Sequence, residues 1–255
     1  MRILPSALLS TAVSITLIGC GGGGSEPEVP INIPQIESLK ALSSTYMGAA
    51  VPAGYEGQFN NGIETRPELQ DVVIQHFDQI TAENIMKSAY IQPRQGDFTF
   101  QDADKLVDWA LDNNITVHAH ALVWHSQMPS WMENYQGDWL TMMDTHVSTV
   151  ADHFKGRVVS WDVVNEALND DGTWRDSPWY RILGEDYIIK AFEFAAKAAP
   201  NAELYYNDYN LFKPEKRDAT VNIVKSLQAK GLRIDAVGIQ GHYGINYPDL
   251  NKLED

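Results

Sequence analysis

The stretch Trp161–Ala167, which reads WDVVNEA, is the most informative part of this chain of 255 residues. It continues a run of β-branched and aromatic residues that begins at Val158, a pattern typical of a strand buried on both faces, as in a parallel sheet. An amide side chain, Asn165, and a carboxylate, Glu166, stand next to each other at the end of this run. In parallel α/β barrels the active site lies at the carboxyl ends of the strands. The stretch therefore predicts a barrel strand that ends in a functional site.

The pair Asn165 and Glu166 suits the hydrolysis of glycosidic bonds. A glutamic acid in this position can protonate the leaving glycosidic oxygen, and the amide can form a hydrogen bond with the 2-hydroxyl of the neighbouring sugar. The alternative is a glutamate that merely ends a strand and faces water. This segment alone leaves both interpretations open.

Strand-like apolar runs alternate with amphipathic helical stretches along the rest of the chain. The predicted strands are 45–51, 77–82, 115–123, 158–164, 202–207 and 234–240, and the predicted helices are 67–76, 101–113, 140–154, 184–198 and 214–230. Strands that alternate with helices predict parallel βα units. The expected fold class is α/β, a (β/α)8 TIM barrel of which this chain contains about the first six units, since a whole barrel takes about 250 residues.

Five motifs lie in a fixed order along the predicted strands and their ends. They are 80–87 (ITAENIMK), 118–127 (HAHALVWHSQ), 161–167 (WDVVNEA), 207–210 (NDYN) and 237–242 (VGIQGH). In sequence and order they resemble the strand-end motifs of glycoside hydrolase family 10, the endo-1,4-β-xylanases. The resemblance implies a TIM barrel that hydrolyses internal β-1,4-xylosidic bonds of xylan with retention of configuration and without a cofactor.

The same resemblance assigns roles to individual residues. Glu166 matches the general acid/base of the family. The residues that match substrate-binding positions are Glu83, Asn84, Lys87, His120, Trp124, Gln127, Asn165, Tyr209, Gln240 and His242. His118 stands where the family commonly has arginine, and we interpret it as a core histidine.

The family carries its catalytic nucleophile, a second glutamate, on a seventh strand, and nothing up to Asp255 corresponds to it. We therefore expect the nucleophile beyond residue 255. We also expect the chain by itself to be an inactive N-terminal part of the catalytic domain, with residues 250–255 inside the helix after the sixth strand. A non-catalytic protein that only binds xylan is the alternative function.

A metal-dependent barrel hydrolase is a less favoured alternative. His118 and His120 alternate onto one face of an extended strand, as a His-x-His metal pair would. Only His242 is available as a further histidine ligand at a later strand end. We therefore expect no metal.

Residues 1–36 are expected to lie outside the fold, which we place at 37–255. Arg2 precedes an apolar run, 3–18, that is too short to span a membrane and is typical of a signal peptide. The segment 17–20 resembles the lipobox of bacterial lipoproteins, although a small residue is preferred where Ile18 stands, and it makes Cys20 the acylated residue. The expectation is a signal peptide at 1–20, a Gly/Pro-rich tether at 21–36 and a place in the bacterial cell envelope, lipid-anchored or secreted.

Net charge restricts the partners of the protein. Acidic residues outnumber basic ones by 34 to 19, which argues against nucleic acid or an anionic membrane surface. Seven Trp and eleven Tyr supply faces on which sugar rings can stack. We expect a monomer that binds xylan and xylo-oligosaccharides and contacts the membrane only through a lipid at Cys20.

Overall fold

A parallel sheet of six strands forms the centre of the protein, in the order β1-β2-β3-β4-β5-β6. The computed structural model describes residues 37–54, 62–248 and 251. Each strand pairs in parallel with the strand before it. The strands are β1 (Gly48–Val51), β2 (Gln79–Ala82), β3 (Thr116–Val123), β4 (Ser160–Asn165), β5 (Glu203–Tyr209) and β6 (Ala236–Gln240).

Five long helices connect the strands. They are α1 (Pro67–His76), α3 (Gln101–Asp112), α5 (Trp139–His153), α7 (Asp186–Ala198) and α8 (Pro214–Ala229). These helices and the six strands confirm the sequence prediction, with bounds that differ by at most three residues. The short elements α2 (Ser88–Ile91), α4 (Ser130–Glu133), α6 (Pro178–Leu183), η1 (Lys40–Leu42) and η2 (Ile63–Thr65) were not predicted.

The starts of the helices follow from local chemistry. Pro67 and Pro214 stand in the first turn of α1 and α8, where the missing N–H has no helical partner to lose. Asp138 accepts a hydrogen bond from the backbone N–H of Leu140 at 3.1 Å and begins α5. Ser177 begins α6 in the same way.

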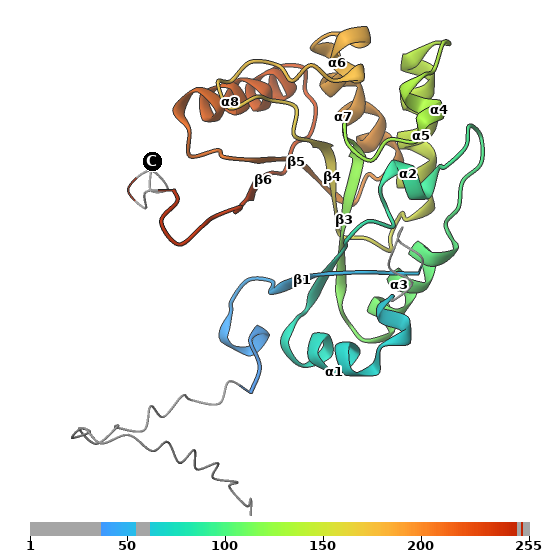
Figure 1. Ribbon diagram of the computed structural model, residues 1–255, viewed down its shortest axis with the longest axis vertical. Helices are drawn as coiled ribbons and strands as arrows, with labels where there is room; N and C mark the ends of the chain where they lie inside the picture. The colour runs from blue at the N-terminus through green and yellow to red at the C-terminus, as the bar shows by residue number, and fades with distance from the viewer. Residues whose placement is uncertain (1–36, 55–61, 249–250, 252–255) are drawn as a thin grey trace, which may run out of the picture. The chain divides into compact units, whose positions relative to one another are not determined.

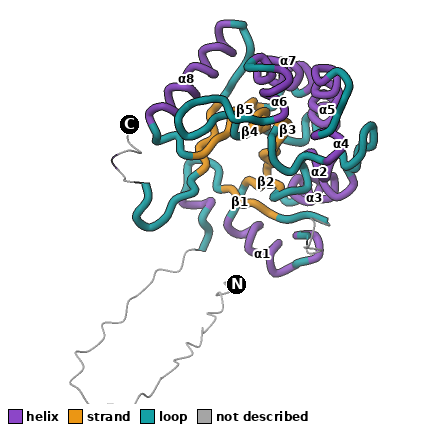
Figure 2. The backbone as a smooth tube through the Cα atoms, turned by 45° about the horizontal axis from the view of Figure 1, so that its top comes forward, coloured by secondary structure: helices purple, strands orange, loops and turns teal. Residues whose placement is uncertain are grey.

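The helices cover the outer face of the curved sheet (Figures 1 and 2). The core lies between these layers, where Trp161, Val163 and Leu204 are fully buried against α5 and α7. Six parallel strands with outer helices form a partial (β/α)8 barrel, as the sequence predicts. Within the described residues no helix is both long and apolar enough to cross a membrane.

Polar side chains of β3 and β4 share the inner face of the sheet, because successive side chains of a strand point to opposite faces and polar residues alternate with apolar ones. The register places His118 opposite Ser160 and His120 opposite Asp162. All six residues of β4 are buried, as expected for a strand covered on both faces.

Some predictions fall on residues outside the described part of the chain. They are the signal peptide, the lipobox at Cys20, the tether and, apart from residue 251, the helix expected at 250–255.

Candidate active site

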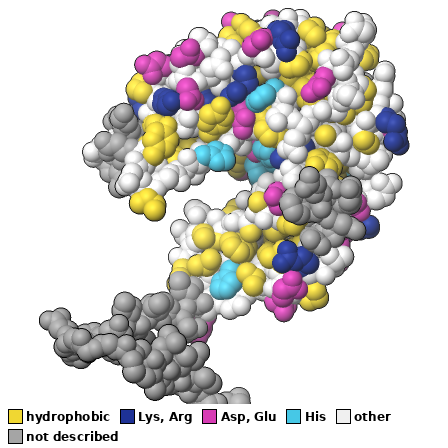
Figure 3. Space-filling model, in the orientation of Figure 1, with side chains coloured by type: hydrophobic (Ala, Val, Ile, Leu, Met, Phe, Trp, Pro, Cys, Tyr) yellow, Lys and Arg dark blue, Asp and Glu magenta, His cyan; other side chains and the backbone are white. Residues whose placement is uncertain are grey.

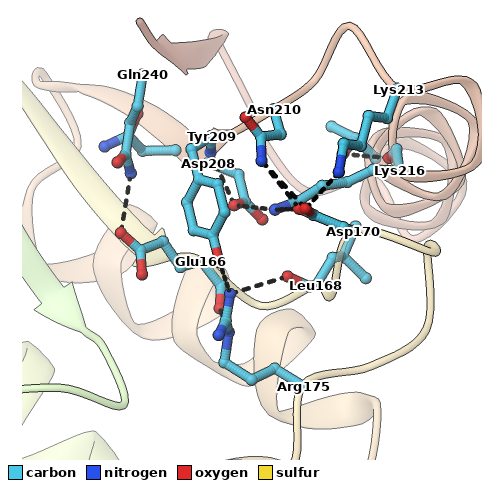
Figure 4. Close-up of polar contacts among 12 residues, drawn as sticks. Glu166, Leu168, Asp170, Arg175, Asp208, Tyr209, Asn210, Lys213, Lys216 and Gln240 are labelled. Carbon is cyan, nitrogen blue, oxygen red and sulfur yellow. Dashed lines mark hydrogen bonds and ion pairs between the residues drawn. The ribbon is translucent and has the colours of Figure 1, made fainter. Parts of the chain in front are cut away.

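Glu166 directly follows β4 and extends its carboxylate towards side chains from two other strands. The indole Nε1 of Trp124, just after β3, donates a hydrogen bond to Oε2 at 3.1 Å. The amide Nε2 of Gln240, at the end of β6, donates to Oε1 at 3.3 Å (Figure 4). The structure thus brings together the ends of β3, β4 and β6 around one carboxylate, which is half-buried.

Asn165 occupies the centre of this arrangement and is almost fully buried. Its side-chain amide lies 3.0 Å from Nε2 of Gln240 and 3.1 Å from Nδ2 of Asn207 on β5. With its oxygen turned the other way, the amide accepts from the indole of Trp124 at 3.1 Å. The neighbours of Asn165 therefore come from the ends of three strands other than its own.

A buried carboxylate, Asp162, supports this layer from inside the barrel. Its Oδ2 lies 2.7 Å from Nδ1 of His120 and 3.2 Å from Nδ2 of Asn207. The same oxygen lies 3.2 Å from Nε2 of His118, whose Nδ1 lies 2.7 Å from Oγ of Ser160. Burial alone would raise the pKa of Asp162, but the hydrogen bonds from His118 and His120 outweigh it and the pKa is lowered. His118, expected to be a core histidine, thus has polar partners on both of its ring nitrogens inside the barrel.

A second polar cluster follows β2. Nζ of Lys87 donates to Oδ1 of Asn84 and to Oε1 of Gln127, each at 2.8 Å. Gln127 also donates to Asn84 at 3.1 Å. The Lys87 ammonium lies 5.0 Å from the centre of the Trp124 ring, which joins this cluster to the Glu166 side of the site. Glu83, the first residue after β2, is exposed.

The other edge of the site contains Tyr209 and His242. Tyr209 ends β5, and its hydroxyl accepts a hydrogen bond from the guanidinium of Arg175 at 2.7 Å. His242 is exposed, with Nε2 at 3.0 Å from Oε1 of Gln240. In the space-filling view, histidine side chains lie around a hollow in this face of the molecule (Figure 3).

Comparison with known proteins assigns this arrangement to a family. A family model described as glycosyl hydrolase family 10 matches residues 37–255. The chain belongs to glycosyl hydrolase family 10.

Proteins named as xylanases are similar to this chain in sequence. An endo-1,4-β-xylanase of Xylanibacter ruminicola is 46% identical over 195 residues, which cover 74% of this chain and 53% of the relative. An endo-β-1,4-xylanase of Cellvibrio japonicus is 44% identical over 236 residues, which cover 87% of this chain and 38% of the relative. The chain therefore spans about half the length, or less, of these family 10 relatives.

Solved family 10 structures have the same fold. The native Cellvibrio japonicus xylanase 10C matches with a TM-score of 0.80 at 43% identity, over 86% of this chain and 48% of the other. A mutant of that protein, solved in complex with xylopentaose, matches with a TM-score of 0.80 at 41% identity, over 86% and 46% of the two chains.

Three residues of this family 10 site were not assigned by sequence reasoning: Asp162, Asn207 and Arg175. Asp162 and Asn207 lie inside the recognised motifs, where a buried acid in an apolar strand and an amide at a strand end were the available signals. Arg175 lies in the loop between β4 and α6, outside every motif. The hydrogen bonds of Arg175 to Glu166, Leu168 and Tyr209 can be identified only from the structure.

The imidazole of His125 lies near two charged side chains, those of Arg175 and Glu166. His125, next to Trp124, is half-buried, and burial together with the nearby Arg175 cation lowers its pKa, while the Glu166 carboxylate acts in the opposite direction. No group of three or more His, Cys, Asp or Glu side chains in the described part of this family 10 chain is arranged to hold a metal ion.

Proposed function

We propose that this chain supplies the acid/base side of an endo-1,4-β-xylanase that hydrolyses xylan with retention of configuration. The proposal rests on the position of Glu166, a half-buried residue directly after β4. Trp124 and Gln240 each donate a hydrogen bond to one of its two carboxylate oxygens. The names of the relatives as xylanases and the xylopentaose bound to one of them support xylan as the substrate.

Glu166 in this proposal first acts as an acid and then as a base. Its proton goes to the glycosidic oxygen as the bond to the anomeric carbon breaks, and the carboxylate then takes a proton from the water that releases the sugar. Asn165 forms a hydrogen bond with the 2-hydroxyl of the sugar at the reacting bond. His120, Trp124 and the cluster of Asn84, Lys87 and Gln127 bind the sugars beyond it.

Retention of configuration requires a second carboxylate, at about 5–5.5 Å from the first, to attack the anomeric carbon. The side chains that bond the Glu166 carboxylate in the described residues are Trp124 and Gln240, and neither can serve as this nucleophile. We propose that a glutamate on a seventh strand, beyond residue 255, supplies it. The other proposed contacts with substrate come from Glu83, Tyr209, Gln240 and His242.

The test is Glu166→Gln in the complete catalytic domain. The variant should lose nearly all activity on xylan, because the hydroxyl oxygen of the departing sugar is a poor leaving group without protonation. The first step on an aryl xylobioside with a dinitrophenol leaving group should be largely kept. Azide should then restore turnover by attacking the xylobiosyl-enzyme and giving a β-xylobiosyl azide.

Glu193→Gln, on the exposed face of α7, is the matched control and should keep full activity. Equal loss on xylan and on the aryl substrate, without azide rescue, would contradict the acid/base role. Binding of xylo-oligosaccharides by a wild-type protein that hydrolyses neither substrate would favour the alternative, a xylan-binding protein without catalysis.

We also propose that the protein is a monomer held in the bacterial envelope by a lipid on Cys20, with 21–36 as the tether. The support is the apolar run 3–18 followed by the lipobox-like segment 17–20. Cys20→Ser should move the protein from the membrane fraction to the soluble fraction of the cells. Unchanged membrane association of this variant would contradict the lipid anchor.

A further inference from the structure

Arg175 connects the loop after β4 with the end of β5. Its Nε donates a hydrogen bond to the carbonyl oxygen of Glu166 at 2.8 Å. Its Nη2 donates to the carbonyl oxygen of Leu168 at 3.1 Å and to the hydroxyl of Tyr209 at 2.7 Å. Figure 4 shows this guanidinium between the Tyr209 ring and the backbone of the loop. Three acceptors from two neighbouring segments therefore share one rigid, planar group.

The backbone of Glu166 depends on such support. Its φ is 57°, in the left-handed region that non-glycine residues rarely adopt. Residues persist in this region when their surroundings fix them. The N–H of Glu166 donates to the carbonyl oxygen of Asn207 at 2.8 Å, and its carbonyl oxygen accepts from Arg175. The two peptides that set the direction of the Glu166 side chain are thus each held by a hydrogen bond.

The ring of Tyr209 is held from a second side by a buried ion pair. Nζ of Lys216, a fully buried residue, lies 3.7 Å from the centre of the ring. The same atom lies 2.7 Å from Oδ1 of Asp208, which also accepts the backbone N–H of Tyr209 at 2.8 Å. A cation against the face of the ring and a guanidinium at its hydroxyl leave Tyr209 little freedom to turn.

We infer that Arg175 is a positioning residue, which holds the acid/base carboxyl of Glu166 and the ring of Tyr209 in a fixed relation through the Glu166 carbonyl and the Tyr209 hydroxyl. The inference rests on the acid/base role proposed for Glu166. Protonation of a leaving oxygen requires the acid within hydrogen-bond reach of that oxygen while the sugars are held in the cleft. Arg175 couples these two requirements.

The test compares Arg175→Gln with Arg175→Lys in the complete catalytic domain. Arg175→Gln should lower kcat on xylan about 100-fold, the size of effect that a displacement of about 1 Å produces. KM should rise by a smaller factor, because the turned Tyr209 ring is a proposed contact with substrate. The first step on the dinitrophenyl xylobioside, measured as a burst of dinitrophenol, should stay near wild type because it needs no proton. Arg175→Lys keeps a cation and one donor, and should recover part of the loss on xylan.

Tyr209→Phe keeps the ring and removes only the hydroxyl that Arg175 binds. Tyr209→Phe should lower kcat on xylan, as Arg175→Gln does. The double variant should be little worse than Arg175→Gln alone, because both substitutions remove the same hydrogen bond between Arg175 and Tyr209. Additive losses in the double variant would overturn the coupling.

A crystal structure of the Arg175→Gln domain provides a readout that does not depend on activity. The expected result is a displaced Glu166 carboxyl together with a turned Tyr209 ring. Both groups unchanged in place, or equal losses on the two substrates, would overturn the inference. A wild-type domain without xylanase activity would instead refute the proposed function, and the crystal structure would still decide whether Arg175 positions the two groups.

Discussion

Strands β4 and β6 belong to the same parallel sheet and both end in side chains of the site, yet they are held very differently. All six residues of β4 are buried, whereas none of the five residues of β6 is. In the described part of the chain, β4 has β3 and β5 on its two sides, and β6 pairs with β5 alone (Figure 1). Within the described residues, β4 is therefore paired on both sides and β6 on one side only.

The polar groups follow the same division. Asp162, Asn165 and Asn207 form a network inside the barrel, with the first two almost fully buried. Gln240 is half-buried and His242 is exposed. An equal substitution should therefore have a larger effect on β4 than on β6, and this difference can be measured.

Asp162→Ala should have the largest effect on stability. It removes the acceptor of His120 and Asn207 and leaves buried polar groups without a partner, so we expect a loss of about 3–5 kcal/mol in the free energy of unfolding. Gln240→Ala is the matched change on β6 and should cost about 1 kcal/mol. Urea denaturation measures both values. Similar losses for the two variants would refute the contrast between the strands.

His146, a buried residue of α5, makes the stability of the protein depend on pH. Burial lowers the pKa of His146 to about 4 from its ordinary 6.5. Between these values the unfolded state binds the proton more readily, so stability falls as the pH decreases. Between pH 7 and 4.5 the loss from this group should be about 2 kcal/mol.

Urea denaturation of His146→Gln at the same two pH values isolates this contribution. The variant should lose about 2 kcal/mol less than wild type on acidification. The matched His242→Gln variant, on the β6 side, should keep the whole acid loss of the wild type. An acid loss that persists in His146→Gln would show that other groups cause it.

Trp124→Phe and Gln240→Ala each remove one donor to the Glu166 carboxylate, at 3.1 and 3.3 Å respectively. Trp124→Phe keeps an aromatic face and should lower kcat/KM on xylan by about 2 kcal/mol of transition-state stabilisation, the usual size for a hydrogen bond to a charged group. Gln240→Ala should cost less, because the hydrogen bond from Gln240 to Glu166 is longer than the one from Trp124. The reverse order in steady-state kinetics would contradict this.

Ile239→Lys, on β6, should have the smallest effect. The side chain of Ile239 is 66% exposed, and a substitution at such a surface position usually changes stability by no more than about 0.5 kcal/mol. Urea denaturation of the 255-residue chain measures the change. A loss above about 2 kcal/mol would show that another segment of this chain covers Ile239.

The sequence predicted the elements whose pattern is long or strongly apolar. The apolar run 158–164 marked β4 to within two residues, and Pro67 and Pro214 marked the starts of α1 and α8. Helices α2, α4 and α6 have four to six residues, too few for a helical period to be recognised.

The site could be predicted at the ends of the strands, and not inside a strand or in a loop. Glu166, Trp124 and Gln240 follow or end their strands, so a parallel sheet brings them together. Asp162 has its histidine partner 42 residues earlier, and Arg175 reaches a hydroxyl 34 residues later. Such partners follow from the curvature of the sheet and the path of one loop, which local patterns do not contain.

Lys216 has a consequence for attempts to engineer this protein. It lies in the first turn of α8, where the helix dipole disfavours a cation, and it is fully buried beside Asp208. Replacing a buried ion pair with apolar residues of similar size often raises stability by about 1–4 kcal/mol. A laboratory selection for heat resistance would therefore favour mutations at these two positions and release the ring of Tyr209. Thermal tolerance alone would be a misleading criterion for improving this protein.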